Sequence, residues 1–242
     1  MDISALNHTC HEGRFLGVLG GMGPMAGASF MARLVALSNA DCDQQHLPAI
    51  LWSDPRIPGR SKGYAKLGPD PLPWMMHGVN RLVSMGAGAI AIPCNTAHLW
   101  YEQISAAVQV PVLHIVQAVI DDLRRQGIHQ GCVGLMGTSA TLRLGLYQRA
   151  LEKNGYRWMM PTETEIADYC SASITLVGAN RIAEALKPAA ECVSILKSRG
   201  ADVVVLGCTE LPLALPHPIR PGLGIPIVDS IDALALAAMD WY

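Results

Sequence analysis

Two cysteines, Cys94 and Cys208, each end a short apolar run that opens with glycine and alanine. The first run reads GAGAIAIPC over 86–94 and the second reads GADVVVLGC over 200–208, a shift of 114 residues. A thiolate can remove a proton as a base, and a thiol can donate one as an acid. Two such groups on opposite faces of a carbon atom can invert that centre. The pair therefore predicts general acid–base chemistry at these two positions.

The other cysteines lack such matched positions. The chain has 7 cysteines, an odd number, and none forms a CxxC pair. A disulfide framework and a clustered structural zinc site are therefore not expected. The remaining cysteines are interpreted as small packing residues without a chemical role, and these are Cys10, Cys42, Cys132, Cys170 and Cys192.

Polar residues follow both thiols directly. Asn95 and Thr96 come after Cys94, and Thr209 and Glu210 come after Cys208. Asn and Thr are typical of helix starts, where the helix dipole stabilises a thiolate and free backbone N–H groups bind carboxylates. An amino-acid substrate has a carboxylate to offer. Such a setting also helps a thiol, whose ordinary pKa is about 8.5, to ionise.

The spacing of the two runs is part of a longer internal match. GVLGGMG over 17–23 matches GCVGLMG over 131–137, again a shift of 114 residues. VPVLHIVQA from Val110 matches IPIVDSIDA from Ile225, a shift of 115 residues. Three matches in one order predict that the chain holds two copies of one α/β unit.

Each copy is expected to run strand, helix, strand, helix, strand. The apolar runs are typical of buried parallel strands, and the segments between them have helical spacing. One helix is expected over 141–155, ending at Gly155, and another over 181–200, kinked or restarted at Pro188. Ligands bind beyond the carboxyl ends of parallel strands, and a pseudo-twofold arrangement would bring both cysteines to one cleft there.

Composition excludes several other classes of protein. Of the 242 residues, 50% are hydrophobic and 16% are charged, which indicates a folded chain. The net charge of −2 gives no basis for a nucleic-acid partner or an anionic membrane surface. No apolar run approaches the roughly 18 residues of a membrane span. The first residues do not resemble a secretory signal, so 1–13 are expected to be a flexible extension and the protein to be cytoplasmic.

The two cysteine motifs, PCNTAH from Pro93 and GCTELP from Gly207, strongly resemble the aspartate/glutamate racemase superfamily, and the aspartate racemase branch in particular. The segments GGMGP, RIPGR, DPLP, PVLH and GLMGTSAT also match, and the resemblance extends from Phe15 to the C-terminus. It implies an α/β fold of two Rossmann-like domains with parallel sheets and the active site between them. The expected division is 14–111 plus 226–242 for the first domain and 112–225 for the second.

The resemblance also implies a function. Cys94 and Cys208 would be the proton acceptor and donor of a racemase that works without a cofactor or metal, usually as a homodimer. The expected substrate is aspartate or glutamate. Its carboxylate and amino groups are expected to be held by Arg60, Asn95, Thr96, Thr138 and Thr209. Arg60 would bind a carboxylate through its two-pronged guanidinium group.

One position departs from the resemblance. Related aspartate racemases carry a lysine that is thought to engage the acidic side chain, whereas the matching position here is Leu176 or Val177. Either the substrate is a different amino acid, or a nearby cation such as Arg181 or Lys62 replaces the lysine. Two broader alternatives stay open, namely a related isomerase or racemase with another substrate and a non-catalytic ligand-binding relative.

Two other motifs favour structural roles. His98 and His114 are expected to cap strand or helix ends, and a zinc site with Cys94 lacks further ligands at suitable spacing. GMGPMA from Gly21 fits a loose dinucleotide-binding pattern, but no acidic residue ends a second strand about 20 residues later. This loop is expected to line the floor of the cleft with backbone N–H groups.

Overall fold

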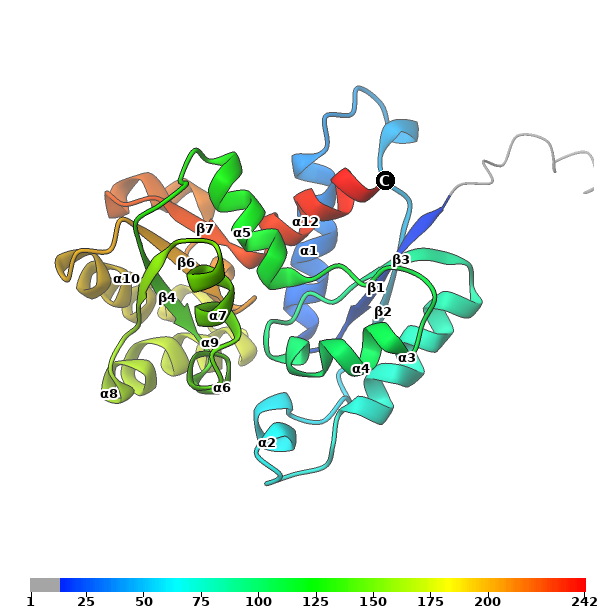
Figure 1. Cartoon of the computed structure of the whole chain (residues 1–242), viewed down its shortest axis with the longest axis horizontal. Helices are drawn as coiled ribbons and strands as arrows, with labels where there is room; N and C mark the ends of the chain where they lie inside the picture. The colour runs from blue at the N-terminus through cyan, green and yellow to red at the C-terminus, as the bar shows by residue number, and fades with distance from the viewer. Residues whose placement is uncertain (1–13) are drawn as a thin grey trace, which may run out of the picture.

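The computed structural model describes residues 14–242, and its strands form two separate parallel sheets (Figure 1). The flexible extension expected over 1–13 lies outside the described residues. The first sheet has the order β2-β1-β3, with β1 at Phe15–Gly20, β2 at Ala49–Ser53 and β3 at Ala87–Ala91. The second has the order β5-β4-β6-β7, with β4 at Cys132–Gly137, β5 at Arg157–Met159, β6 at Val203–Gly207 and β7 at Ile227–Asp229. The expected fold of two Rossmann-like α/β units is confirmed.

The central strands are apolar along their whole length because helices cover both faces of each sheet. Every residue of β4 and β6 is buried, and so is β1 from Leu16 onward. Fully buried parallel strands of this kind do not alternate polar and apolar residues. The strands therefore form rigid supports, and the residues that follow β3 and β6 are held in place by the core.

The helices follow the strands in the expected alternation. The principal ones are α1 (Pro24–Leu37), α3 (Leu72–Ser84), α4 (Tyr101–Ala106), α5 (Ile115–Arg125), α6 (Ser139–Arg143), α7 (Leu146–Lys153), α9 (Ala172–Gly178), α10 (Ile182–Ser198) and α12 (Ser230–Trp241). Shorter elements are α2 (Arg60–Tyr64), α8 (Glu163–Glu165), α11 (Leu211–Ala214), the 3-10 helices at Asp43–Gln45, Thr96–Trp100 and His217–Leu223, and a π-helix at Ile166–Ser171.

Helices α5 and α12 join the two units. Helix α12 packs against α1 of the first unit, and it also packs against α5, which itself contacts α7 and β7 of the second (Figure 1). The expected boundary before residue 226 needs one correction, because β7 pairs with β6 in the second sheet through Val204 and Ile227. Only the helix of the 226–242 segment crosses to the first unit. The remaining division into two domains stays a proposal.

The two sheets share one strand order. In the first, the isolated bridge between Ile90 and Val112 adds the 110–112 segment beside β3, just as β7 lies beside β6 in the second. Both sheets thus run in one order: the second strand of the unit lies at the edge, followed by its first strand, its third strand and a final short segment. Such a correspondence is what an internal duplication predicts.

Two helices differ from their predicted form. The helix expected over 141–155 is divided into α6 and α7 because Gly145 takes a left-handed backbone conformation (φ 68°). The expected end at Gly155 agrees with the structure, since this residue follows α7 with φ 82°. Helix α10 runs from Ile182 to Ser198 through Pro188, so no second helix starts there.

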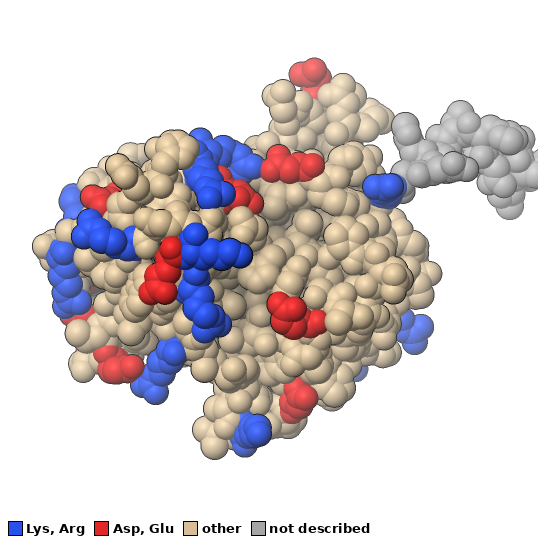
Figure 2. Space-filling view, in the orientation of Figure 1, with Lys and Arg blue, Asp and Glu red and all other residues tan. Residues whose placement is uncertain are grey.

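Charged side chains are unevenly spread over the face shown in Figure 2. They gather over the second unit, where acidic and basic groups alternate, and are sparse over the first. Several form exposed ion pairs, such as Arg143 with Glu163 and Arg124 with Asp121. In the described part of the chain, no helix combines the length and apolar character needed to cross a membrane.

Candidate active site

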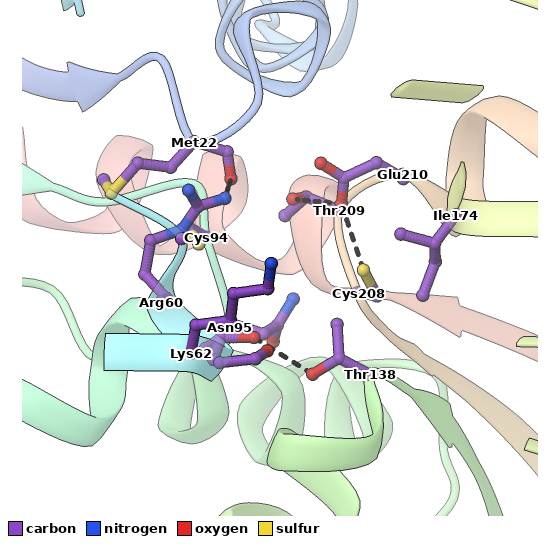
Figure 3. Close-up of a pocket in the computed structure, with 13 residues that line it drawn as sticks. Met22, Arg60, Lys62, Cys94, Asn95, Thr138, Ile174, Cys208, Thr209 and Glu210 are labelled. Atoms are coloured by element: carbon purple, nitrogen blue, oxygen red, sulfur yellow. Dashed lines mark hydrogen bonds between the residues drawn. The ribbon is translucent and has the colours of Figure 1, made fainter. Parts of the chain in front are cut away.

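A cavity of about 440 Å³ holds both predicted thiols at the carboxyl ends of β3 and β6 (Figure 3). Its lining includes all seven residues singled out from the sequence. The full lining is Met22, Gly59, Arg60, Ser61, Lys62, Cys94, Asn95, Thr96, Thr138, Ile174, Cys208, Thr209 and Glu210. Both units contribute to it, so the cavity lies between them.

Cys94 is held at the end of β3 with 4% of its surface exposed. Its backbone N–H donates to the Ile92 carbonyl at 2.7 Å, a tight turn that leads into the 3-10 helix at Thr96–Trp100. Burial raises the pKa of the Cys94 thiol, while the positive charge of Arg60 and a hydrogen bond from the Ala97 backbone act in the opposite direction. The surroundings of Cys94 therefore contain groups that favour its thiolate.

Cys208 has an acidic neighbour instead. Its Sγ donates a hydrogen bond to Glu210 Oε2 at 3.0 Å, and the thiol is also 4% exposed. Burial raises the pKa of this thiol well above its ordinary value, and the negative charge of Glu210 raises it further. Glu210 thus favours the protonated form of Cys208.

The Glu210 carboxylate also links the two units. Its Oε1 accepts a hydrogen bond from the Gly23 backbone N–H at 3.2 Å, and its Oε2 accepts one from Thr209 Oγ1 at 3.3 Å. The loop that carries Gly23 depends on Gly21, which has φ 91° and whose added Cβ would lie 2.4 Å from the Asp54 backbone. The expectation that this loop presents backbone N–H groups to the cleft matches the Gly23 contact.

Three threonine hydroxyls form a small network across the units. Thr96 Oγ1 lies 3.1 Å from both Thr138 Oγ1 and Thr141 Oγ1, and Thr138 Oγ1 donates to Thr141 Oγ1 at 2.9 Å. Thr138 also caps α6 by accepting from the Thr141 backbone N–H at 3.1 Å. Because Thr138 donates its one hydroxyl proton to Thr141, and Thr141 can donate to Thr96, the Thr96 hydroxyl at the edge of the cavity is the one from which a carboxylate could accept.

Asn95 is fixed from both sides of its amide. Its Oδ1 accepts from the Tyr147 hydroxyl at 2.5 Å, and its Nδ2 donates to Ser230 Oγ at 2.8 Å. Ser230 in turn donates to the Leu206 carbonyl at 3.0 Å, which connects Asn95 to strand β6. One N–H of the amide remains for a substrate.

Arg60 begins the short helix α2 and reaches back over the cavity. Its Nη2 donates to the Met22 carbonyl at 2.8 Å, whereas its buried Nε has no partner among the described residues. Lys62, two residues later, is exposed and also lines the cavity. Helix α2 therefore brings two cations, Arg60 and Lys62, to a cavity whose lining includes one carboxylate, that of Glu210.

The histidines have the expected structural roles and do not line this cavity. His98 Nε2 accepts from the Ile115 backbone N–H at 3.1 Å, and Nδ1 lies 2.9 Å from the Cys94 carbonyl. A neutral ring protonated at Nδ1 satisfies both contacts, and burial lowers the pKa of His98 to about 4. His114 Nδ1 accepts from the backbone N–H of Val116 and caps α5.

A possible metal-ligand cluster lies apart from the cavity lining. Within residues 14–242, His217, Asp229 and Asp232 have ligand atoms within 4.8 Å of one another. Arg220 pairs with Asp229 at 2.6 Å, and Arg33 pairs with Asp232 at 2.5 Å. Because arginines already neutralise both carboxylates, the cluster is better suited to joining the units than to holding a cation.

The structure also clarifies the position that departs from the aspartate racemases. Leu176 packs against the core and Val177 is buried, while Ile174 is the residue of α9 that lines the cavity. Arg181 pairs with Glu184 on the surface, and Lys62 is at the cavity. Sequence reasoning did not single out Ile174 or give Glu210 a role, although Glu210 lies within the GCTELP motif itself.

Comparison with known proteins agrees with this architecture. Residues 19–238 match the family model described as Asp/Glu/Hydantoin racemase. The chain is 27% identical over 237 residues to the broad specificity amino-acid racemase RacX of Bacillus subtilis, covering 94% of this chain and 97% of that protein. The aspartate racemase structure from Picrophilus torridus has a TM-score of 0.84 at 28% identity, with 95% and 94% of the two chains covered.

A partial match extends to another group of enzymes. The glutamate racemase of Persephonella marina is 30% identical over 162 residues, which span 65% of this chain and 59% of that protein. The fold and the family match define the class as amino-acid racemases, which are isomerases. The chain belongs to the Asp/Glu/hydantoin racemase family, and the resemblance inferred from its cysteine motifs is confirmed.

Proposed function

We propose that this racemase works without a cofactor and uses Cys94 and Cys208 as opposed general base and general acid. The observation that carries the proposal is that both thiols, from the ends of equivalent strands in the two units, line one cavity. An amino acid bound between them would present its α-carbon to one thiol on each face.

In one direction, the Cys94 thiolate removes the α-proton. The Cα–H bond breaks, an S–H bond forms on Cys94, and the electron pair remains on the substrate. Cys208 then donates its proton to the other face, so its S–H bond breaks and a new Cα–H bond forms. The thiols have exchanged protonation states, and the reverse reaction starts from the state that the forward reaction leaves.

Polar groups around the substrate carboxylate would stabilise the negative charge that develops during proton removal. The Thr96 hydroxyl and the free amide N–H of Asn95 line the cavity as donors. Thr138 and Thr209 line it too, and their hydroxyls would have to turn from Thr141 and Glu210 to donate to a substrate. Donors that are already oriented by the protein need little reorganisation as charge develops, and this is the largest single contribution in many enzymes. Arg60 would add a full positive charge.

We propose aspartate or glutamate as the substrate. Arg60 and Lys62 support this proposal because they bring positive charge to the cavity. A second candidate is a wider range of amino acids, which is favoured by the apolar Ile174 in the lining and by the similarity to RacX, a broad specificity racemase. A homodimer, implied by the resemblance, stays a prediction that light scattering of the purified protein would test.

The direct test is exchange of the α-proton in deuterated water, followed by proton NMR with each enantiomer of aspartate and glutamate and with other amino acids. The Cys94→Ser and Cys208→Ser variants should each lose about 10²- to 10⁴-fold in racemisation, which is the usual contribution of a general acid–base group. Cys42→Ser is the matched control, because Cys42 is exposed and does not line the cavity.

Two outcomes would contradict the proposal. Racemisation that survives in Cys94→Ser or Cys208→Ser would exclude the two-thiol mechanism. Calorimetry that shows binding of amino acids by a protein that exchanges none of them would favour the non-catalytic alternative. Product analysis by chiral chromatography separates racemisation from a related isomerisation.

A further inference from the structure

Lys62 lines the cavity, but it has no role in the proton transfers of the proposed two-thiol mechanism. It lies in α2 together with Arg60, and both side chains line the space in which the thiols lie. Figure 3 shows the Lys62 amino group extending into the cavity, on the side of Arg60 and facing the wall formed by Cys208. A substrate between the thiols would therefore lie within the field of this ammonium group.

The short turn that carries Lys62 is held against the protein. The Lys62 carbonyl accepts from the Leu67 backbone N–H at 2.9 Å, and Gly63 donates to the Gly59 carbonyl at 2.8 Å. Gly63 packs so closely on the following segment that an added Cβ would lie 2.5 Å from Pro71 Cδ. The backbone of Lys62 is thus fixed, and only its side chain has freedom to meet a ligand.

No carboxylate of the described residues neutralises the two cations of the cavity. Neither Arg60 nor Lys62 forms an ion pair there, whereas Arg56 on the same loop pairs with Asp54 at 2.8 Å. The buried Arg60 Nε has no hydrogen-bond partner in this part of the chain. A buried guanidinium N–H without a partner is costly, so an anionic ligand would satisfy it.

The carboxylate of Glu210, the acidic residue in the cavity lining, already accepts hydrogen bonds from the protein. Glu210 accepts hydrogen bonds from Cys208, Thr209 and Gly23, and so has little capacity left to neutralise a lysine. Two cations against one carboxylate leave a formal charge of +1 in the lining while both thiols are protonated. An amino acid with an acidic side chain carries a net charge of −1 and complements this surplus.

The wall opposite Lys62 includes one apolar side chain, that of Ile174. Ile174 faces the cavity from α9 and has neither a donor nor an acceptor in its side chain. The hydroxyls and the Asn95 amide suit the α-carboxylate, which every amino acid has. With Arg60 also assigned to the charge around the α-carboxylate, Lys62 is left for a second carboxylate.

We propose that Lys62 determines specificity by binding the side-chain carboxylate of an acidic amino-acid substrate. The inference rests on the proposed racemase function and assigns one residue of it. Lys62 does not touch the reacting α-carbon, so its removal should affect the choice between substrates and leave proton transfer intact.

The test compares each acidic amino acid with its amide, which has nearly the same shape and no side-chain charge. Wild type, Lys62→Met, Lys62→Arg and Lys187→Met are each given aspartate, asparagine, glutamate and glutamine, and kcat/KM is measured from α-proton exchange in deuterated water. Lys187 is the control because it is an exposed lysine of α10 outside the cavity lining.

Lys62→Met should lose roughly 10- to 100-fold in kcat/KM for the acid, the range of one charge-assisted hydrogen bond, and keep its rate with the amide. Lys62→Arg should retain the preference, and Lys187→Met should match wild type. If wild type exchanges amino acids but Lys62→Met slows acid and amide alike, or slows neither, the role of Lys62 is wrong and the racemase function stands. If wild type exchanges no amino acid, the racemase function fails, and the role of Lys62 fails with it.

Discussion

Cys208 Sγ donates a hydrogen bond to Glu210 Oε2 at 3.0 Å. The Glu210 charge also raises the pKa of Cys94, at the equivalent end of the other unit, but there the positive charge of Arg60 lowers it by more. The two thiols therefore differ in charge environment although their strands and flanking motifs correspond. In the proposed two-thiol mechanism, this difference favours a resting state in which Cys94 would be the readier base and Cys208 the readier acid.

Replacing Glu210 should shift the pH dependence of the reaction direction that needs the Cys208 thiolate more than that of the other direction. Burial and the Glu210 carboxylate both raise the pKa of Cys208, so the direction that needs the Cys208 thiolate should speed up as pH rises through that pKa. Glu210→Gln removes a negative charge that opposes ionisation, so this limb of kcat/KM should move to lower pH by about one unit or more. The measurement is the pH profile of kcat/KM for each enantiomer.

The control for this shift is Glu191→Gln, an exposed residue of α10 that does not line the cavity. It should leave both profiles unchanged. Profiles of Glu210→Gln that coincide with those of wild type for both enantiomers would show that the carboxylate does not control Cys208.

Replacing Arg60 should make Cys94 harder to ionise. The Arg60 charge lowers the pKa of a thiol that burial raises, and Arg60→Met removes this opposing effect. Alkylation of Cys94 by iodoacetamide, followed by peptide mass spectrometry at pH 8, should slow by about tenfold, equivalent to one unit of thiol pKa. Arg81→Met, an exposed position on α3, is the control. An unchanged alkylation rate at Cys94 in Arg60→Met would show that the Arg60 charge does not lower the pKa of the Cys94 thiol.

The Tyr147 hydroxyl is expected to contribute stability through Asn95. Tyr147 is fully buried and donates to Asn95 Oδ1 at 2.5 Å, so Tyr147→Phe leaves a buried acceptor without its partner. The free energy of unfolding should fall by about 1–3 kcal/mol. Urea denaturation measures it, with exposed Tyr242→Phe as the control. Equal stability of the two variants would mean that the bond contributes nothing.

His98 predicts a loss of stability in acid. Its pKa is about 4 in the folded chain against 6.5 ordinarily, because burial disfavours the charged ring. The unfolded chain then binds the extra proton first, so the stabilising contribution is present above pH 6.5 and is lost as pH falls toward 4. Between pH 7 and pH 4, the unfolding free energy of wild type should fall by about 3 kcal/mol more than that of His98→Gln. Parallel pH curves for the two proteins would contradict this.

Much of the fold could be predicted from apolar runs and the internal match. The runs ending at Cys94 and Cys208 contain strands β3 and β6, which are buried apart from half-buried Gly88 in β3, and buried parallel strands have a clear sequence pattern. The segment over 163–178 was not predicted, because its short helices and π-helix depend on packing against α10. The place of β7 was also missed, since pairing with β6 is a tertiary contact that local periodicity does not record.

The site could be predicted where motif and position agreed. All seven candidate residues line one cavity, because strand ends and helix starts place short polar motifs at a sheet edge. Glu210 was not given a role, since its value arises from contacts with Cys208 and with Gly23, which is distant in sequence. Ile174 could not be predicted from the sequence. Val177 packs into the core, and this packing decides which face of α9 is turned toward the cavity.

Whether two opposed thiols move the α-proton is decided by where deuterium appears early in the reaction. One pure enantiomer is incubated with the enzyme in deuterated water, and the reaction is stopped before about 10% conversion, so that few molecules have reacted twice. Both enantiomers are then separated and analysed by mass spectrometry. If each thiol serves one face, the product carries deuterium at Cα, while the recovered substrate keeps its original proton. Product that retains the substrate's proton, or substrate that exchanges as fast as product forms, would show that a single base serves both faces.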